Sequence, residues 1–164
     1  MSVFVRTAGA RDIPAIHALL AETWHATYDG FYGAGTVEAM LAELHSPKAL
    51  QAMIDRDRSE YLVADDGERL CGCAYAAAAG EDARVVTLFQ LYVLPALQGR
   101  GIGGMLLEEI EQSFFESERL RLEVEEKNSR AVAFYETEGF SQTAREEHGG
   151  ALPRTLLIYE KSLV

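Results

Sequence analysis

Apolar positions recur along this chain at two spacings, which predict two kinds of secondary structure. Apolar residues three or four positions apart predict helices with one buried stripe, while short apolar runs or strict alternation predict strands. In the first such helix, Ile16, Leu20 and Trp24 share one face. The expected elements are a strand over 3–7, helices over 12–27, 36–44 and 47–56, strands over 61–64, 70–79 and 85–93, a helix over 101–115, a strand over 120–124, a short helix after 128, and strands over 142–147 and 155–161.

The densest cluster of glycines opens the helix expected over 101–115. Four glycines fall within six residues there, after an apolar strand and a short loop. Glycines keep Cβ atoms away from a ligand, and the first N–H groups of a helix have no acceptor within it. These donors and the positive end of the helix dipole favour an anion such as phosphate or pyrophosphate. The cluster therefore predicts an anion site, with Arg100 in its loop.

Three kinds of glycine-rich phosphate site compete for this loop. A Walker A loop needs Lys and then Ser or Thr after its last glycine, but Met105 follows Gly104 here. The order Gly99-x-Gly101-x-x-Gly104 matches the dinucleotide fingerprint, and Glu123 falls where a ribose-binding acid would lie. However, several residues separate these glycines from the strand, and too little chain follows to build a dinucleotide domain.

The third match is Gln98-x-x-Gly101-x-Gly103, which resembles motif A of the GCN5-related N-acetyltransferase (GNAT) family. In that family the motif cradles the pyrophosphate of acetyl-CoA. A second segment agrees, because the pattern Asn-x-x-Ala-x-x-Phe-Tyr-x-x-x-Gly-Phe over residues 128–140 resembles motif B of the same family. The order of the two motifs and their spacing of about thirty residues make the pair more specific than either motif alone.

The resemblance covers nearly the whole chain and implies its fold. The expected class is α/β (α+β), with a mixed, twisted sheet flanked by helices, in a single domain over residues 1–164. A chain of 164 residues is long enough to bury a core of this kind without disulfides or metals.

The resemblance also implies where acetyl-CoA binds and which residue acts on it. The Val93 N–H contacts the thioester carbonyl, and Asn128 either bonds the pantetheine arm or caps a helix. Tyr135 is the expected general acid for the leaving thiolate, since a phenol with a pKa of about 10 stays neutral at physiological pH. Its alternative role is packing against Phe134. The expected cofactor contacts are Leu91, Tyr92, Val93, Gln98, Gly99, Arg100, Gly101, Ile102, Gly103, Gly104 and Asn128.

The acceptor and the general base are less defined. Many members of the family carry a glutamate on the central strand, but the position aligned with it here is Thr87. The remaining bases are Glu123, Glu125, His25, Tyr28 or a chain of waters. The family builds its acceptor pocket largely from the first-helix region, which corresponds here to residues 23–32. The expected acceptor contacts are Trp24, His25, Tyr28 and Glu123.

The net charge limits the classes of binding partner, and the cysteine content indicates the cellular compartment. Acidic residues outnumber basic ones by 26 to 15, for a net charge of −11, which argues against nucleic acid and anionic membranes as partners. The surplus acid either attracts a cationic amine or keeps the chain soluble. Cys71 and Cys73 lie two residues apart on one strand face, so they are expected to be core residues in a reducing compartment. We therefore expect a cytoplasmic protein, monomer or homodimer, without a metal site or a membrane span.

Two functions are favoured by these patterns, and dinucleotide binding is a third, which binding of NAD or FAD without affinity for CoA would support. The first is an acetyl-CoA-dependent N-acetyltransferase that acetylates an amine on a small molecule or a peptide N-terminus. The second is a non-catalytic CoA-binding or sensing module of the same fold, which the absence of the strand glutamate favours. Release of free CoA in the presence of amines separates them.

Overall fold

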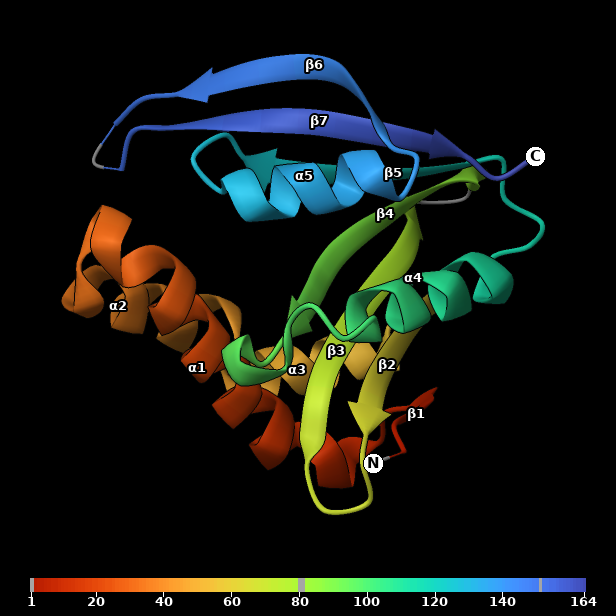
Figure 1. Cartoon of the computed structure of the whole chain (residues 1–164), viewed down its shortest axis with the longest axis horizontal. Coiled ribbons are helices and arrows are strands. Elements are labelled where there is room, and N and C mark those ends of the chain that lie inside the picture. The colour runs from red at the N-terminus through yellow and green to blue at the C-terminus, as the bar shows by residue number, and fades with distance from the viewer. Residues whose placement is uncertain (1, 80–81, 151) are drawn as a thin grey trace. The chain divides into compact units, whose positions relative to one another are not determined.

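The computed structural model describes residues 2–79, 82–150 and 152–164. The chain divides into two compact units (Figure 1). Unit 1 contains Met1–Ala77 and Gln90–Ser113, and unit 2 contains Ala78–Phe89 and Phe114–Val164. The fourth strand, β4 (Asp82–Val93), contributes its first part to unit 2 and its last four residues to unit 1.

Unit 1 combines an antiparallel set of strands with four helices. Its strands are β1 (Phe4–Thr7), β2 (Ser59–Asp65) and β3 (Leu70–Ala79), in the order β1-β2-β3-β4. Its helices are α1 (Ile13–Tyr32), α2 (Ala34–Leu44), α3 (Pro47–Asp55) and α4 (Ile102–Ser113). The expected elements are all present, with one correction. The first helix, expected to end at residue 27, continues to Tyr32 and ends where Gly33 takes a positive φ of 84°.

The two faces of the β2–β3 hairpin pack against different helices. Tyr61 lies directly opposite Tyr75, and Val63 lies opposite Cys73, so these four side chains share one face. The other face includes Leu62 and Ala74, and α4 contacts β2 there, with Leu106 fully buried. Burial of both faces explains why β3 is apolar along nearly its whole length rather than alternating.

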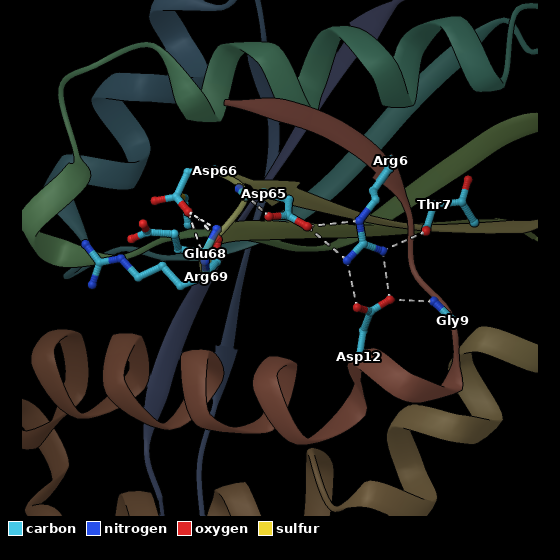
Figure 2. A network of polar contacts seen from close by, with 10 residues as sticks. Arg6, Thr7, Gly9, Asp12, Asp65, Asp66, Glu68 and Arg69 are labelled. Carbon is cyan, nitrogen blue, oxygen red and sulfur yellow. Dashed lines mark hydrogen bonds and ion pairs between the residues drawn. The ribbon is translucent and has the colours of Figure 1, made fainter. Parts of the chain in front are cut away.

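A partly buried ionic network joins the first strand, the start of the first helix and the second strand of unit 1 (Figure 2). The Arg6 guanidinium donates to both oxygens of Asp12, at 2.8 and 2.9 Å, and its Nε donates to Asp65 at 3.1 Å. The Gly9 N–H donates to Asp12 at 2.8 Å. The bonds from Arg6 lower the pKa of Asp12 to about 2, despite the opposing effect of burial. The network fixes where α1 starts relative to β1 and β2.

Unit 2 contains the remaining strands and one helix. β4 pairs in parallel with β5 (Arg119–Glu125), from Val85 opposite Arg119 to Leu88 opposite Leu122. β5 pairs antiparallel with β7 (Arg154–Ser162), which pairs antiparallel with β6 (Ser141–His148); Figure 1 shows β6 and β7 side by side. Helix α5 (Ser129–Thr137) lies between β5 and β6 in sequence.

Within the described residues, seven strands and five α-helices confirm the expected class, an α/β fold with a mixed sheet. The β4–β5 pair is parallel, whereas β1–β2, β2–β3, β5–β7 and β6–β7 are antiparallel. Across the described ranges, no helix is long and apolar enough to cross a bilayer. The expectation of a single domain stays a prediction.

Candidate active site

The glycine loop of unit 1 connects the end of β4 to the start of α4. After Val93 the chain makes a short 3-10 turn over Pro95–Leu97, and Gln98 is extended. Gly99 and Gly101 then take left-handed φ angles of 80° and 85°. These angles require glycine, because a Cβ atom is strained there. A Cβ atom at either position would meet nothing within 4 Å, so the loop is open on the side that the missing side chains would fill.

The loop presents backbone donors to that open side. The first intrahelical bond of α4 runs from the Met105 N–H to the Gly101 carbonyl at 3.1 Å. The N–H groups of Ile102, Gly103 and Gly104 precede it, at the positive end of the helix. Gly99 and Gly101 thus take positive φ angles on either side of Arg100. Turns of this kind can direct successive N–H groups toward an anion. The predicted loop residues lie together, and their binding of a phosphate stays a prediction.

The last peptide groups of β4 are held from both edges. The Leu94 N–H donates to the Cys71 carbonyl of β3 at 2.9 Å. The Gln98 Nε2 donates to the Val93 carbonyl at 3.2 Å, so this predicted cofactor residue bonds the strand end with its side chain. Leu91, Tyr92 and Val93 are each half-buried. The glycine loop and the strand that precedes it are thus tied together within unit 1.

The expected acceptor segment forms a ladder of aromatic rings along α1. Trp24 is buried and packs edge-on against Tyr28 at 5.1 Å between ring centroids, and Tyr28 lies 5.9 Å from Tyr32. Trp24 also lies 6.4 Å from Tyr92 of β4. Two predicted site residues, one from the acceptor set and one from the cofactor set, are therefore brought together in unit 1.

His25 is engaged by carboxylates on both sides of its ring. Its Nδ1 donates to Asp29 at 2.7 Å, and its Nε2 donates to Glu38 of α2 at 2.9 Å. These bonds, first to Asp29 and then to Glu38, raise the pKa of His25. Through these two contacts His25 links α1 to α2, and both of its ring nitrogens are engaged.

A buried polar cluster of His45, Gln90 and Tyr61 contacts Trp24 of the aromatic ladder through His45. The sequence did not predict it. The Gln90 Nε2 donates to His45 Nδ1 at 3.2 Å, and its Oε1 accepts a short hydrogen bond from the Tyr61 hydroxyl. His45 packs edge-on against Trp24 at 5.1 Å, and its carbonyl accepts from His17 at 2.8 Å. Burial lowers the pKa of His45 to about 4. The sequence feature that could have indicated this cluster is Gln90, a polar residue in an otherwise largely apolar strand.

In unit 2, the two predicted residues of the second motif are both engaged in local structure. Asn128 caps α5, because its Oδ1 accepts from the Ala131 N–H at 3.2 Å. Tyr135 is buried, and its ring packs edge-on against Phe134 and Phe140 at 5.4 and 5.5 Å. Capping by Asn128 uses its carbonyl oxygen and leaves its amide N–H₂ as a donor.

The acidic candidates for a base differ in their surroundings. Glu123 is exposed and accepts from Arg121 at 3.4 Å, whereas Glu125 is buried. Thr87 lies on β4 opposite Arg121 and is half-buried.

Both cysteines are reduced and buried, and burial raises their pKa, that of Cys73 to about 12. High thiol pKa values make them poor nucleophiles and poor metal ligands. In the described part of the chain, no group of three or more metal-ligating side chains lies together.

Comparison with known proteins identifies the class to which this α/β fold and glycine loop belong. The acetyltransferase (GNAT) family matches this chain over residues 16–140. The chain therefore belongs to the GNAT acetyltransferase family.

Solved structures with the same fold agree with this family. PaiA N-acetyltransferase from Thermoplasma acidophilum, solved with coenzyme A, is 25% identical, with a TM-score of 0.86 over 99% of each chain. The ribosomal-protein-S18-alanine N-acetyltransferase from Escherichia coli is 19% identical, with a TM-score of 0.76 over 99% of this chain and 94% of that one. YncA from Salmonella typhimurium, a putative acetyltransferase solved with acetyl-CoA, is 20% identical, with a TM-score of 0.72 over 100% and 95%.

Proposed function

We propose that this chain, as one domain over residues 1–164, transfers the acetyl group of acetyl-CoA to an amine. The observation that carries the proposal is the glycine loop, in which Gly99 and Gly101 are left-handed and open the helix that follows β4. Such a loop suits the pyrophosphate of CoA. Membership of the GNAT family and the CoA complexes of related structures support the same ligand.

The acetyl carbonyl needs a donor as negative charge develops on its oxygen. The amine nitrogen forms a bond to the acetyl carbon, the C–S bond breaks, and the electron pair leaves with sulfur. We assign the donor to the Val93 N–H at the end of β4, and Leu91 and Tyr92 to the pantetheine arm, which would pair with the strand through its amides. A preorganised N–H in this position stabilises the oxyanion of the transition state.

Two protons must move during this transfer. Tyr135 would supply one to the departing thiolate as general acid, as family resemblance suggests, and the Asn128 amide would bond pantetheine. The amine loses the other proton to a base that stays open among Glu123, Glu125, Tyr28 and water. His25 is disfavoured because two carboxylates already engage its ring.

The acceptor is assigned only as a class. Trp24, Tyr28 and His25 would line its site, with a cationic amine favoured by the acidic balance of the chain. Asp29 and Glu123 each contact a basic side chain, which reduces the local field. Cytoplasmic location and a monomeric or homodimeric state belong to the same proposal.

A non-catalytic CoA-binding module is the second candidate, favoured by Thr87 at the position of the family's strand glutamate. The deciding experiment measures release of free CoA from acetyl-CoA with a panel of cationic, neutral and anionic amines at two ionic strengths. Turnover with any amine supports the enzyme, and a fall of kcat/KM with added salt supports a cationic acceptor. Tight CoA binding without turnover across the panel supports the module.

A further inference from the structure

Gly72 of β3 lies beside the end of β4 and has no side chain. A Cβ atom added to Gly72 would lie 2.7 Å from the Tyr92 carbonyl oxygen and 3.1 Å from Leu106 Cδ1 of α4. The Val93 side chain would lie 3.4 Å away, which is ordinary contact. The first of these neighbours is backbone, so it cannot turn aside as the end of a flexible side chain could. Only glycine lets β3 approach the Tyr92 carbonyl so closely.

The Tyr92 carbonyl belongs to the same peptide group as the Val93 N–H. A peptide group is planar and rigid, so a displacement of its oxygen moves or rotates its N–H as well. Successive N–H groups of a strand point to opposite edges. Because the Leu94 N–H points to Cys71 of β3, the Val93 N–H points to the other edge of β4.

Neighbouring contacts hold the next peptide group in place. Its N–H is bonded by the Cys71 carbonyl and its carbonyl by Gln98, so the Val93–Leu94 peptide is fixed from both sides. The Tyr92–Val93 peptide directly precedes it, and its carbonyl oxygen is the atom that an added Cβ on Gly72 would approach most closely, at 2.7 Å. A side chain at Gly72 would therefore press on the peptide that carries the Val93 N–H.

We infer that Gly72 is a positioning residue for acetyl transfer. Because Gly72 has no side chain, the Tyr92–Val93 peptide can keep the orientation in which it offers the Val93 N–H to the thioester carbonyl. The inference rests on the proposed function, in which Val93 is that donor. It assigns Gly72 no contact with substrate. Its role is to place the donor, and a misplacement of about 1 Å at a reacting centre can lower a rate by about a hundredfold.

The test is Gly72→Ala, measured against Gly9→Ala. Gly9 has an extended backbone, and a Cβ atom there would meet nothing within 4 Å, so this control reports only the general effect of replacing glycine by alanine. We expect Gly72→Ala to lower kcat about tenfold or more. The affinity for CoA, which has no acetyl carbonyl, should change less than threefold. Gly9→Ala should change neither quantity.

A second variant separates the two close contacts of the added Cβ atom. Leu106→Val shortens the side chain at 3.1 Å but leaves the backbone oxygen at 2.7 Å. In Gly72→Ala/Leu106→Val the melting temperature should recover part of the loss caused by Gly72→Ala, while kcat stays low. The carbonyl stretch of bound ¹³C-labelled acetyl-CoA should also shift less in this variant than in the wild type, because the hydrogen bond from Val93 is weakened.

Three results would overturn the inference while leaving acetyl transfer by the wild-type chain intact. One is wild-type kcat in folded Gly72→Ala. Another is a parallel loss of CoA affinity and kcat, which would place the effect in α4 and the loop. The third is failure of both variants to fold, which would make Gly72 a requirement of the fold. Absence of turnover in the wild type would instead contradict the proposed function itself.

Discussion

The two segments that resemble the family's motifs are built in opposite ways. In the glycine loop of unit 1 the groups offered to a ligand are backbone N–H groups, positioned by the left-handed φ angles of Gly99 and Gly101. In α5 of unit 2 the groups of interest are the side chains of Asn128 and Tyr135, and each also has a structural task, as a cap and as a buried ring. A backbone site is fixed by conformation alone, whereas a side-chain site must be separated from packing by experiment.

The largest expected effect on turnover comes from removing the Tyr135 hydroxyl in α5. Tyr135→Phe keeps the ring between Phe134 and Phe140 and removes only the hydroxyl. If Tyr135 is the general acid, kcat should fall by about 10²- to 10⁴-fold with little change in the affinity for CoA, as stopped-flow or steady-state assays would measure.

A matched control is Tyr159→Phe, which removes a hydroxyl that donates to Glu136 of the same helix at 3.1 Å. This control should retain kcat. Near wild-type turnover in Tyr135→Phe would leave Tyr135 with its packing role alone.

The next largest effect is expected on the affinity for acetyl-CoA when a charge is added to the glycine loop. Gly103→Glu places a carboxylate in the first turn of α4, where the backbone is helical. Its charge should repel the pyrophosphate, and we expect the Kd for acetyl-CoA, by calorimetry, to rise about a hundredfold or more.

Met105→Glu adds the same charge to an exposed position of α4 and serves as the control. A folded Gly103→Glu chain with unchanged affinity would show that acetyl-CoA does not bind at this loop.

Titration of His45 extends the comparison to the acceptor side of unit 1. Its pKa is lowered from 6.5 to about 4 by burial, so between these values the unfolded chain binds a proton that the folded chain does not. The contribution of His45 to the free energy of unfolding is therefore fully present above pH 6.5. It is lost as the pH falls to 4, by roughly 3 kcal/mol at most. His25 titrates in the opposite sense, because its raised pKa stabilises the folded chain at low pH.

The difference between wild type and His45→Gln isolates His45, since His25 is common to both. Urea melts at pH 7 and pH 4.5 should show a smaller loss of stability in the variant. Equal losses would contradict a neutral, buried His45. The glycine loop has no titratable side chain besides Arg100, so its own conformation should not follow this transition.

The smallest effect concerns Asn128. Asn128→Asp keeps a capping oxygen but removes the amide donor, whereas Asn128→Ala removes both. Loss of the cap should cost about 1 kcal/mol of stability in the alanine variant alone. If the amide bonds pantetheine, kcat/KM should fall several-fold in both variants. A wild-type kcat/KM in Asn128→Asp would leave Asn128 as a cap only.

Local signals in the sequence predicted most of the scaffold. Ser46 is of a residue type that caps helices, and its Oγ accepts from the Ala49 N–H at the start of α3, at 3.1 Å. Gly139 follows the helix of the second motif, where glycine commonly ends a helix, and it takes a φ of 96°. Both signals depend on residues within three or four positions, where chain geometry restricts the outcome.

Contacts between distant residues could not be predicted in this way. His45 and Gln90 are separated by 45 positions, and Arg6 and Asp65 by 59. No periodicity links such pairs, so neither the depressed pKa of His45 nor the engagement of Asp12 was expected. The same limit applies to Gly72, whose importance depends on Tyr92 of another strand.

The Arg6 network also has a consequence for how this chain can change over evolution. Asp12 and Asp65 bracket the segment that contains α1, α2 and α3, and Arg6 ties its two ends together beside β1. The segment also contains β2, and its two ends are held together by side chains outside the three helices. If the aromatic ladder around Tyr28 and Tyr32 lines the proposed acceptor site, substitutions there would change the acceptor and leave this anchor in place.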